Sequence, residues 1–271
     1  MNFLNKIIEQ KRKEVEEHKG LYPEKLLEKT IYFSSPTVSL RKYLLRDDKI
    51  GIIAEIKKKS PSKGILNQYI SIERTSIGYM QAGASALSVV TETEFFGGKN
   101  EDLTIARKFN YCPVLRKDFI IDEYQVIETK SIGADVVLLI ANVLDPSRIK
   151  VLAKLAKSLN LEVLLEVRDK KELTESLNEY IDIVGVNNRN LFDFRVNISQ
   201  SFDLASLIPN DFIKISESGI HAVKTIHDLK AVGYRGFLIG EAFMQHSRPE
   251  IACTNFIKEV IAYEEGMAHS V

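Results

Sequence analysis

The chain has 271 residues, 45% of them hydrophobic, and its 37 basic residues balance its 37 acidic ones. This composition indicates a soluble globular protein, and the balanced charge leaves no global charge to attract nucleic acid or an anionic membrane, so any anion site must be local. The N-terminus turns charged too soon for a signal peptide, no run approaches the ~18 apolar residues of a membrane span, and Cys112 and Cys253 lack the spacing of a metal site or a disulfide framework. We therefore expect a cytoplasmic protein without a metal, a membrane or a nucleic-acid partner.

Residues 1–48 are predicted to form a helical extension. Leu4, Ile7, Ile8 and Val15 recur at helical spacing among charged residues, a pattern typical of an amphipathic helix with a narrow apolar stripe. The pattern fits a solvated helix docked on the main body. It fits equally a helix that lies over one end of a barrel and helps to close a site, and the sequence leaves both open.

From Gly51 onward, a short β-rich run followed by a helical stretch recurs with short connections. Near-continuous apolar runs such as VVLLI and IVGV are typical of parallel strands covered on both faces. The eight predicted strands are Gly51 to Lys57, Ala86 to Thr91, Pro113 to Asp118, Asp135 to Ala141, Glu162 to Val167, Ile181 to Asn187, Phe212 to Glu217 and Gly236 to Ile239. Predicted helices between them include Ser71 to Ala82, Asp122 to Ser131, Asp145 to Leu159, Asp169 to Glu179 and His221 to Ala231.

Eight such units predict a (β/α)₈ barrel, a TIM barrel, as a single domain over residues 1–271. A doubly wound open sheet is the alternative. It would call for a glycine fingerprint after the first strand, and the sequence has none there.

The first predicted strand and the loop after it carry the clearest functional signal. Side chains alternate along a strand, so Glu55 and Lys57 share one face. An ion pair at a partly exposed edge would explain them without function, because burying either charge alone is costly. However, the following Ser60-Pro61-Ser62-Lys63-Gly64 is a rigid, amide-rich turn suited to receiving an anion.

Polar residues also end several later strands, where the chemistry of such barrels is found. These residues are Lys117, Glu166, Asn187-Asn188-Arg189 and Glu217-Ser218-Gly219. The turns Ser218-Gly219-Ile220 and Ile239-Gly240-Glu241 predict a phosphate site, because glycine lets the backbone approach phosphate oxygens. Tight turns alone would also explain these glycines.

The run IIAEIKKKSPSKG resembles the signature of the indole-3-glycerol-phosphate synthase family. Further segments agree with that family in order and spacing, namely TEFFGG, PVLRKDFI, LLEV, GVNNRNL, SESGI and FLIGEAFM. The resemblance spans the whole chain, including the helical N-terminal extension. It implies a carboxy-lyase of class EC 4.1.1.48 in tryptophan biosynthesis, with no cofactor, working as a monomer on an aromatic sugar phosphate.

The same resemblance implies roles for individual residues. Lys117 matches the general acid and Glu166 its partner in proton transfer. The other catalytic matches are Glu55, Lys57, Asn187 and Glu217; the substrate-binding matches are Ser60, Phe96, Phe119 and Arg189; and the phosphate-binding matches are Ser218, Gly219, Gly240 and Glu241. Many relatives have serine in place of Glu241, so we expect its carboxylate, which would repel phosphate, to turn away and leave only its N–H in use.

Three questions stay open at this level. Lys57 and Lys117 could exchange roles between the proton-transfer steps. A Schiff-base, aldolase-like barrel would instead use a lysine of depressed pKa as a nucleophile on a sugar-phosphate carbonyl. A sugar-phosphate-binding barrel without activity is a third reading, although the complete set of acids and bases argues against it.

Overall fold

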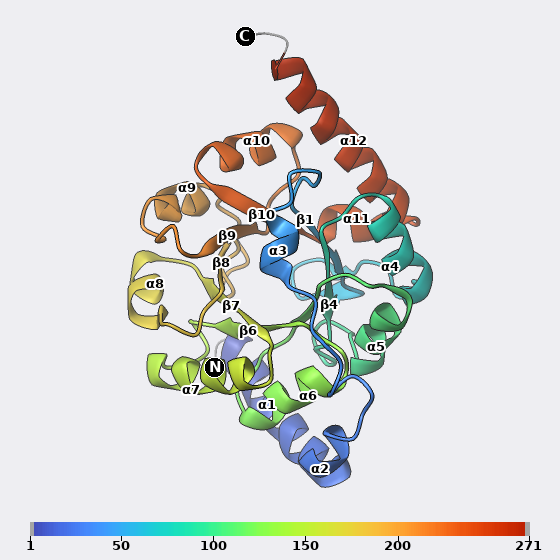
Figure 1. Cartoon of the computed structure of the whole chain (residues 1–271), viewed down its shortest axis with the longest axis vertical. Helices are drawn as coiled ribbons and strands as arrows, with labels where there is room; N and C mark the ends of the chain where they lie inside the picture. The colour runs from blue at the N-terminus through green and yellow to red at the C-terminus, as the bar shows by residue number, and fades with distance from the viewer. Residues whose placement is uncertain (1–2, 269–271) are drawn as a thin grey trace.

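The computed structural model describes residues 3–268; residues 1–2 and 269–271, which the expected domain 1–271 includes, lie outside the described part. Within it, eight parallel strands close into a barrel in the order β1-β10-β9-β8-β7-β6-β5-β4 (Figure 1). The (β/α)₈ prediction is therefore confirmed. The barrel strands are β1 (Ile52–Ile56), β4 (Ala86–Val90), β5 (Val114–Lys117), β6 (Val136–Ile140), β7 (Glu162–Val167), β8 (Ile183–Asn187), β9 (Ile213–Glu217) and β10 (Tyr234–Ile239).

The register aligns the polar strand ends at one end of the barrel. Glu166 of β7 lies opposite Ile140 of β6, and Asn187 of β8 lies opposite Glu217 of β9. Parallel strands direct all their carboxyl ends to the same edge of the sheet. Side chains that are far apart in the sequence thus meet at one rim.

Helices cover the outside of the barrel, and several begin at the residues that the sequence suggested. Ser71, Asp122 and Asp169 each cap a helix with a side-chain oxygen that accepts a backbone N–H. These outer helices are α4 (Ile72–Gln81), α5 (Asn100–Phe109), α6 (Glu123–Ser131), α7 (Pro146–Ser158), α8 (Lys170–Ser176), α9 (Ser199–Ala205), α10 (Val223–Ala231), α11 (Glu241–Met244) and α12 (Pro249–Ala268).

Two local predictions need correction. Helix α8 ends at Ser176 and not at Glu179, because the Asn178 side chain accepts the N–H of Tyr180 and so favours a turn over the helix. The loop after β1 is more ordered than a turn. It forms a small antiparallel hairpin of β2 (Lys59–Ser60) and β3 (Gly64–Ile65).

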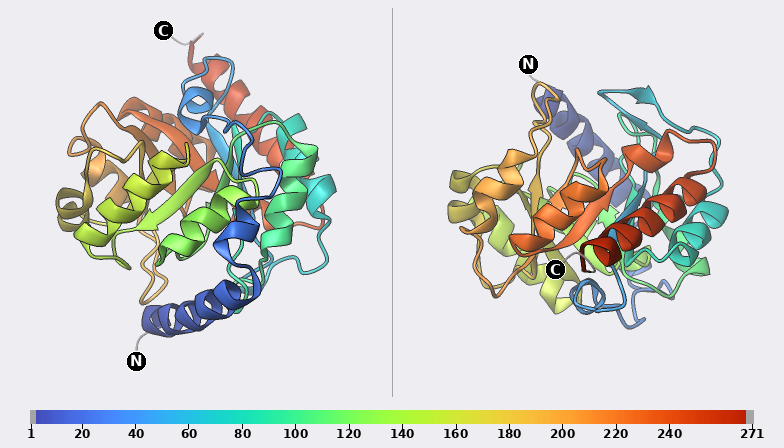
Figure 2. Two further views of the ribbon diagram at one scale, coloured as in Figure 1. Left: turned by 60° about the horizontal axis from the view of Figure 1, so that its bottom comes forward. Right: turned by 90° about the horizontal axis from the view of Figure 1, so that it is seen from above.

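The N-terminal extension lies over both ends of the barrel. It consists of α1 (Phe3–Leu21), α2 (Glu24–Leu27) and α3 (Leu40–Leu44). Leu40 and Leu44 of α3, together with Leu4 and Ile7 of α1, join the apolar cluster that fills the barrel interior. Figure 2 shows α1 and α3 on opposite sides of the barrel, with α1 on the side of the loops that follow the strands. Helix α1 is thus docked on the main body over one end of the barrel, and that it helps to close a site stays a prediction.

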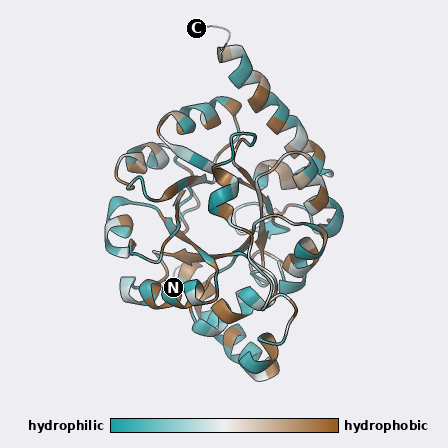
Figure 3. Ribbon diagram, in the orientation of Figure 1, coloured by the Kyte–Doolittle hydropathy of each residue, from teal (hydrophilic) through white to brown (hydrophobic). Residues whose placement is uncertain are grey.

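The core has two layers, one inside the barrel and one between the strands and the outer helices. Figure 3 shows apolar residues along the strands and on the inward faces of the helices, with polar residues facing outward. Both cysteines, Cys112 and Cys253, are buried and free. None of the helices within residues 3–268 has the combination of length and apolar character that a bilayer crossing requires.

Candidate active site

A cavity with about 100 Å³ of space for water lies at the carboxyl ends of the strands. A smaller one of about 40 Å³ adjoins it beside β9 and β10. The structure brings all the predicted site residues to these two cavities. The larger is lined by Glu55, Lys57, Ser60, Phe96, Lys117, Phe119, Glu166, Asn187, Arg189, Glu217, Ser218 and Glu241, and the smaller also by Gly219 and Gly240.

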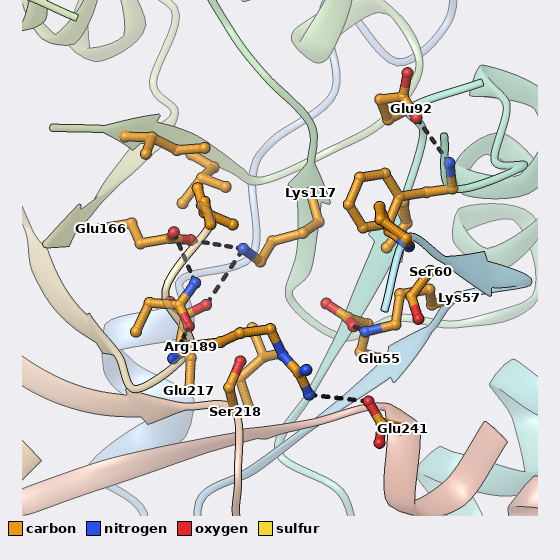
Figure 4. A pocket seen from close by; sticks show the side chains of 18 of the residues that line it. Glu55, Lys57, Ser60, Glu92, Lys117, Glu166, Arg189, Glu217, Ser218 and Glu241 are labelled. Carbon is orange, nitrogen blue, oxygen red and sulfur yellow. Dashed lines mark hydrogen bonds and ion pairs between the residues drawn. The ribbon is translucent and has the colours of Figure 1, made fainter. Parts of the chain in front are cut away.

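Lys117 lies between two carboxylates. Its Nζ is 2.7 Å from Glu166 Oε2 and 3.3 Å from Glu217 Oε2 (Figure 4). Burial favours the neutral amine, but the negative charges of Glu166, Glu217 and Glu55 outweigh burial and raise the pKa of Lys117 above its ordinary value. The lysine is thus a positioned ammonium, able to donate a proton.

Glu55 and Lys57 form a second acid-base pair on β1 and the residue after it. Lys57 Nζ is 2.8 Å from Glu55 Oε1, which confirms that the two side chains share a face. Burial would raise the pKa of Glu55, but the ammonium groups of Lys57 and Lys117 lower it below its usual value. Two lysines and their carboxylates therefore face one cavity.

Asn187 orients Glu166. Its side-chain amide donates to Glu166 Oε1 at 2.9 Å, and its carbonyl oxygen accepts the backbone N–H of Arg189 at 2.9 Å. The second Glu166 oxygen remains on Lys117. A carboxylate held at both oxygens keeps one direction toward the cavity.

Glu217 is the least satisfied group of the site. Its Oε1 is buried and has no hydrogen-bond partner among the described residues. Burial, together with the charges of Glu166 and Glu55, raises the pKa of Glu217 to about 7 in spite of the ammonium of Lys117. Gly185 makes room for this carboxylate, because a Cβ there would lie 2.4 Å from Oε1. No feature of the sequence around Gly185 indicated this role.

Aromatic side chains form the apolar wall of the cavity. The rings of Phe96 and Phe119 lie 6.2 Å apart between centroids. Glu92, which the sequence analysis missed, fixes the loop before Phe96 because its Oε2 accepts the N–H groups of Phe95 and Phe96, each at 2.8 Å. Burial raises the pKa of Glu92. The sequence feature that could have identified Glu92 is a carboxylate that follows an apolar strand and directly precedes the segment TEFFGG.

Two loops line the smaller cavity with glycines, Gly219 after β9 and Gly240 after β10. Ser218 and Gly219 have φ of 68° and 76°, which is the left-handed region where glycine is favoured. Gly240 is needed for a different reason, since a Cβ there would lie 2.6 Å from Glu55 Oε1. A larger residue at 240 would therefore disturb Glu55 as well as the cavity.

The prediction that the Glu241 side chain turns away is wrong. Arg189 Nη2 donates to Glu241 Oε2 at 2.9 Å, and both side chains lie at the cavities (Figure 4). The prediction rested on repulsion by phosphate alone. The guanidinium of Arg189, from another loop, attracts the carboxylate and holds it at the cavities.

A buried ion pair ties α1 to the strand that carries Lys117. Lys11 Nζ is 2.9 Å from Asp118 Oδ1, and the narrow apolar stripe expected for α1 did not include this lysine. Burial would raise the pKa of Asp118, but the charges of Lys11 and Arg116 lower it to about 2. Two carboxylates, Asp118 directly after β5 and Glu14 on α1 itself at 3.0 Å, explain why a lysine occupies the buried face of α1.

Within residues 3–268, no group of three or more histidine, cysteine, aspartate or glutamate side chains is arranged to hold a metal ion.

Comparisons with solved structures agree with the fold. A thiamine phosphate pyrophosphorylase from Pyrococcus furiosus matches with a TM-score of 0.58 at 16% identity, over 82% of this chain and 99% of that one. A 3-hexulose-6-phosphate synthase from Salmonella typhimurium matches with a TM-score of 0.57 at 14% identity, over 78% of this chain and 99% of that one. At such identities these structures show the shared barrel only.

Sequence relatives are more specific. The family described as indole-3-glycerol phosphate synthase matches residues 4–256. A protein of that name from Bacteroides thetaiotaomicron is 43% identical over 259 residues, which cover 96% of this chain and 99% of the relative. Another, from Carboxydothermus hydrogenoformans, is 39% identical over 91% of this chain and 96% of its own length. The chain therefore belongs to the indole-3-glycerol phosphate synthase family.

Proposed function

We propose that the chain closes the indole ring of 1-(2-carboxyphenylamino)-1-deoxyribulose 5-phosphate, giving indole-3-glycerol phosphate, carbon dioxide and water. This is the carboxy-lyase reaction EC 4.1.1.48 of tryptophan biosynthesis. The observation that carries the proposal is the Lys117 ammonium, held between Glu166 and Glu217 beside a smaller cavity that Gly219 and Gly240 line. Family membership supports the same reaction.

The first step needs an acid. The ring carbon that bears the carboxylate must attack the sugar carbonyl, which is a poor electrophile until its oxygen receives a proton. Lys117 donates that proton, and a positioned acid of this kind contributes roughly 10²- to 10⁴-fold in rate. Phe96 and Phe119 contact the aromatic ring, Ser60 lies at its edge, and Arg189 binds the substrate carboxylate.

The later steps need an acid and a base. Carbon dioxide leaves with its bonding electrons going back into the ring, which restores aromaticity. The hydroxyl on the former carbonyl carbon then leaves as water after taking a proton from a lysine, and a carboxylate takes a proton from the neighbouring carbon to complete the indole. Lys57 with Glu55 supplies one pair for this step, and Lys117 with Glu166 supplies the other.

The Schiff-base alternative fits the site less well. A lysine nucleophile must be neutral, and such lysines have depressed pKa values. Three carboxylates raise the pKa of Lys117 instead.

We assign the phosphate to the loops of Ser218, Gly219 and Gly240. We propose that the protein is cytoplasmic. We also propose that it works as a monomer, because one chain supplies every residue of the site.

A turnover assay tests the proposal. The purified protein is mixed with the carboxyphenylamino sugar phosphate, and indole fluorescence and released carbon dioxide are followed together. We expect one carbon dioxide for each indole formed. Borohydride in the same mixture should trap no lysine adduct, and an adduct without indole formation would favour the aldolase-like reaction.

A further inference from the structure

Arg189 joins three loops at the mouth of the site. Its Nη1 donates to Ser62 Oγ at 3.2 Å, in the hairpin after β1, and its Nη2 donates to Glu241 Oε2 at 2.9 Å, at the start of α11. The Arg189 and Glu241 side chains are only 19% and 17% exposed. The ion pair is thus part of the pocket and not a solvated surface contact.

The pair also stands at the border between the two cavities. Arg189 and Glu241 line both the larger cavity, which contains Lys117 and the aromatic wall, and the smaller one at Gly219 and Gly240. Glu241 directly follows Gly240 in the chain. An anion in the smaller cavity would therefore lie beside a carboxylate. Because like charges repel each other at this range, the carboxylate lowers the affinity of the cavity for the anion several-fold.

We propose that the Glu241 carboxylate occupies Arg189 as an internal substitute for the substrate's own carboxylate, and that arrival of the phosphate displaces it. This inference rests on the proposed function, which places a phosphate in the smaller cavity and an aromatic carboxylate near Arg189. Phosphate repels Glu241, the ion pair opens, and the freed guanidinium binds the aromatic carboxylate. Glu241 thus couples the two halves of the substrate and favours a molecule that carries both anions.

A second partner for the displaced carboxylate is close by. Lys63 Nζ lies 3.9 Å from Glu241 Oε1, and its side chain is 58% exposed on the hairpin loop. The carboxylate can turn toward this ammonium without being left unpaired. Because coupling between two sites is reciprocal, phosphate must tighten the binding of an aromatic carboxylate by the same factor as that ligand tightens the binding of phosphate.

Calorimetric titration with two small probes tests the inference. We measure binding of inorganic phosphate and of 2-aminobenzoate to the full chain, each alone and in the presence of the other. In the unaltered protein, saturating phosphate should tighten 2-aminobenzoate binding about fivefold. In Glu241→Gln, each probe alone should bind roughly five- to tenfold more tightly, and the mutual effect should vanish.

Controls separate the possible failures. Glu241→Ser provides a second neutral variant, and Glu123→Gln removes a matched arginine-paired glutamate at the start of α6, which does not line either cavity. Unchanged phosphate affinity in both Glu241 variants, or no mutual effect of the probes in the unaltered protein, would overturn the inference. Indole formation by the unaltered protein is measured alongside, so a protein that makes indole without coupling refutes only this inference, and a protein that makes none refutes the proposed function.

Discussion

The two ends of the barrel are formed by the same strands and differ in what fills them. At the carboxyl end, Lys117 lines a small cavity together with five glutamates, Glu55, Glu92, Glu166, Glu217 and Glu241. At the amino end, α3 inserts Leu40 and Leu44 into the apolar interior, so closely that a Cβ on Gly236 would lie 3.2 Å from Leu44 Cδ1. The buried charges at the carboxyl end lower the stability of the folded protein, whereas the packed apolar side chains at the amino end raise it.

This difference shows how the fold tolerates its site. Glu217 is buried with one oxygen unpaired, which costs stability in the folded protein. The apolar end contributes burial that does not depend on any charge. Substitutions at the charged end should therefore lower turnover without lowering stability, and substitutions at the apolar end should lower stability without lowering turnover.

The largest expected effect is a difference in turnover between substitutions at the two ends of β7. Glu166→Gln at the carboxyl end should lower turnover about a hundredfold or more, because the base is lost together with its negative charge beside Lys117. Glu162→Gln at the amino end is the matched control. Glu162 accepts hydrogen bonds from Ser39 and from the Arg41 N–H and so holds α3, which means that its loss should lower stability and leave turnover intact. Steady-state assays and urea unfolding of both variants check the contrast, and equal turnover in the two variants would break it.

Leu44→Ala should have the next largest effect, on stability. Removing a fully buried leucine costs about 3 kcal/mol of unfolding free energy through lost burial and a residual cavity. The adjacent Leu45 is 51% exposed, so Leu45→Ala is the control and should be nearly neutral. Turnover per folded molecule should stay unchanged in both, and a large loss of turnover in Leu44→Ala would show that the two ends are not separable.

Glu217→Gln should stabilise the protein at alkaline pH. The folded-state pKa of about 7 lies above the ordinary 4.5, so folding favours the protonated form, and above pH 7 the folded protein must hold a buried ionised carboxylate. The neutral amide avoids this cost. We expect about 2 kcal/mol of added unfolding free energy at pH 8 and less at pH 5. Denaturant unfolding at both pH values measures it, with the exposed Glu259→Gln as control, and destabilisation at pH 8 would contradict the account.

The smallest effect concerns the attachment of α1. His18 Nδ1 is 2.9 Å from Glu128 Oε1, and this hydrogen bond raises the pKa of His18. A raised pKa gives stability that is fully present below the unfolded value of about 6.5 and is lost as pH rises through the folded value. His18→Gln should therefore lower the unfolding free energy slightly at pH 6 and not at pH 8.5. His246→Gln, which replaces an exposed histidine, is the control, and an equal loss at both pH values in His18→Gln would exclude the charged pair.

Much of the fold was predictable because its signals are local. Several barrel strands are short apolar runs, and several of the predicted helices begin directly after a capping residue such as Ser71 or Asp122. Parallel strands then place all their carboxyl ends together, so Lys117 and Glu166 could be assigned to one rim without any knowledge of their distance.

The missed features depend on partners from distant segments. A lysine at position 11 is unexpected on the apolar face of a helix, and its ion-pair partner Asp118 lies far away in the sequence. Glu241 was expected to turn away because Arg189, on a different loop, could not be placed. From the sequence, Gly185 is an ordinary residue of a buried strand. Its role becomes clear only because the carboxylate of Glu217 packs against it. Such pairings follow from packing and not from local pattern.

The most direct test of the central claim is the single-turnover rate of indole formation in Lys117→Met, measured beside the unaltered protein at equal folded fractions. The account predicts a rate at least a hundredfold lower, with inorganic phosphate still bound, because the acid for ring closure is gone while the smaller cavity is intact. A rate within a fewfold of the unaltered protein would contradict it.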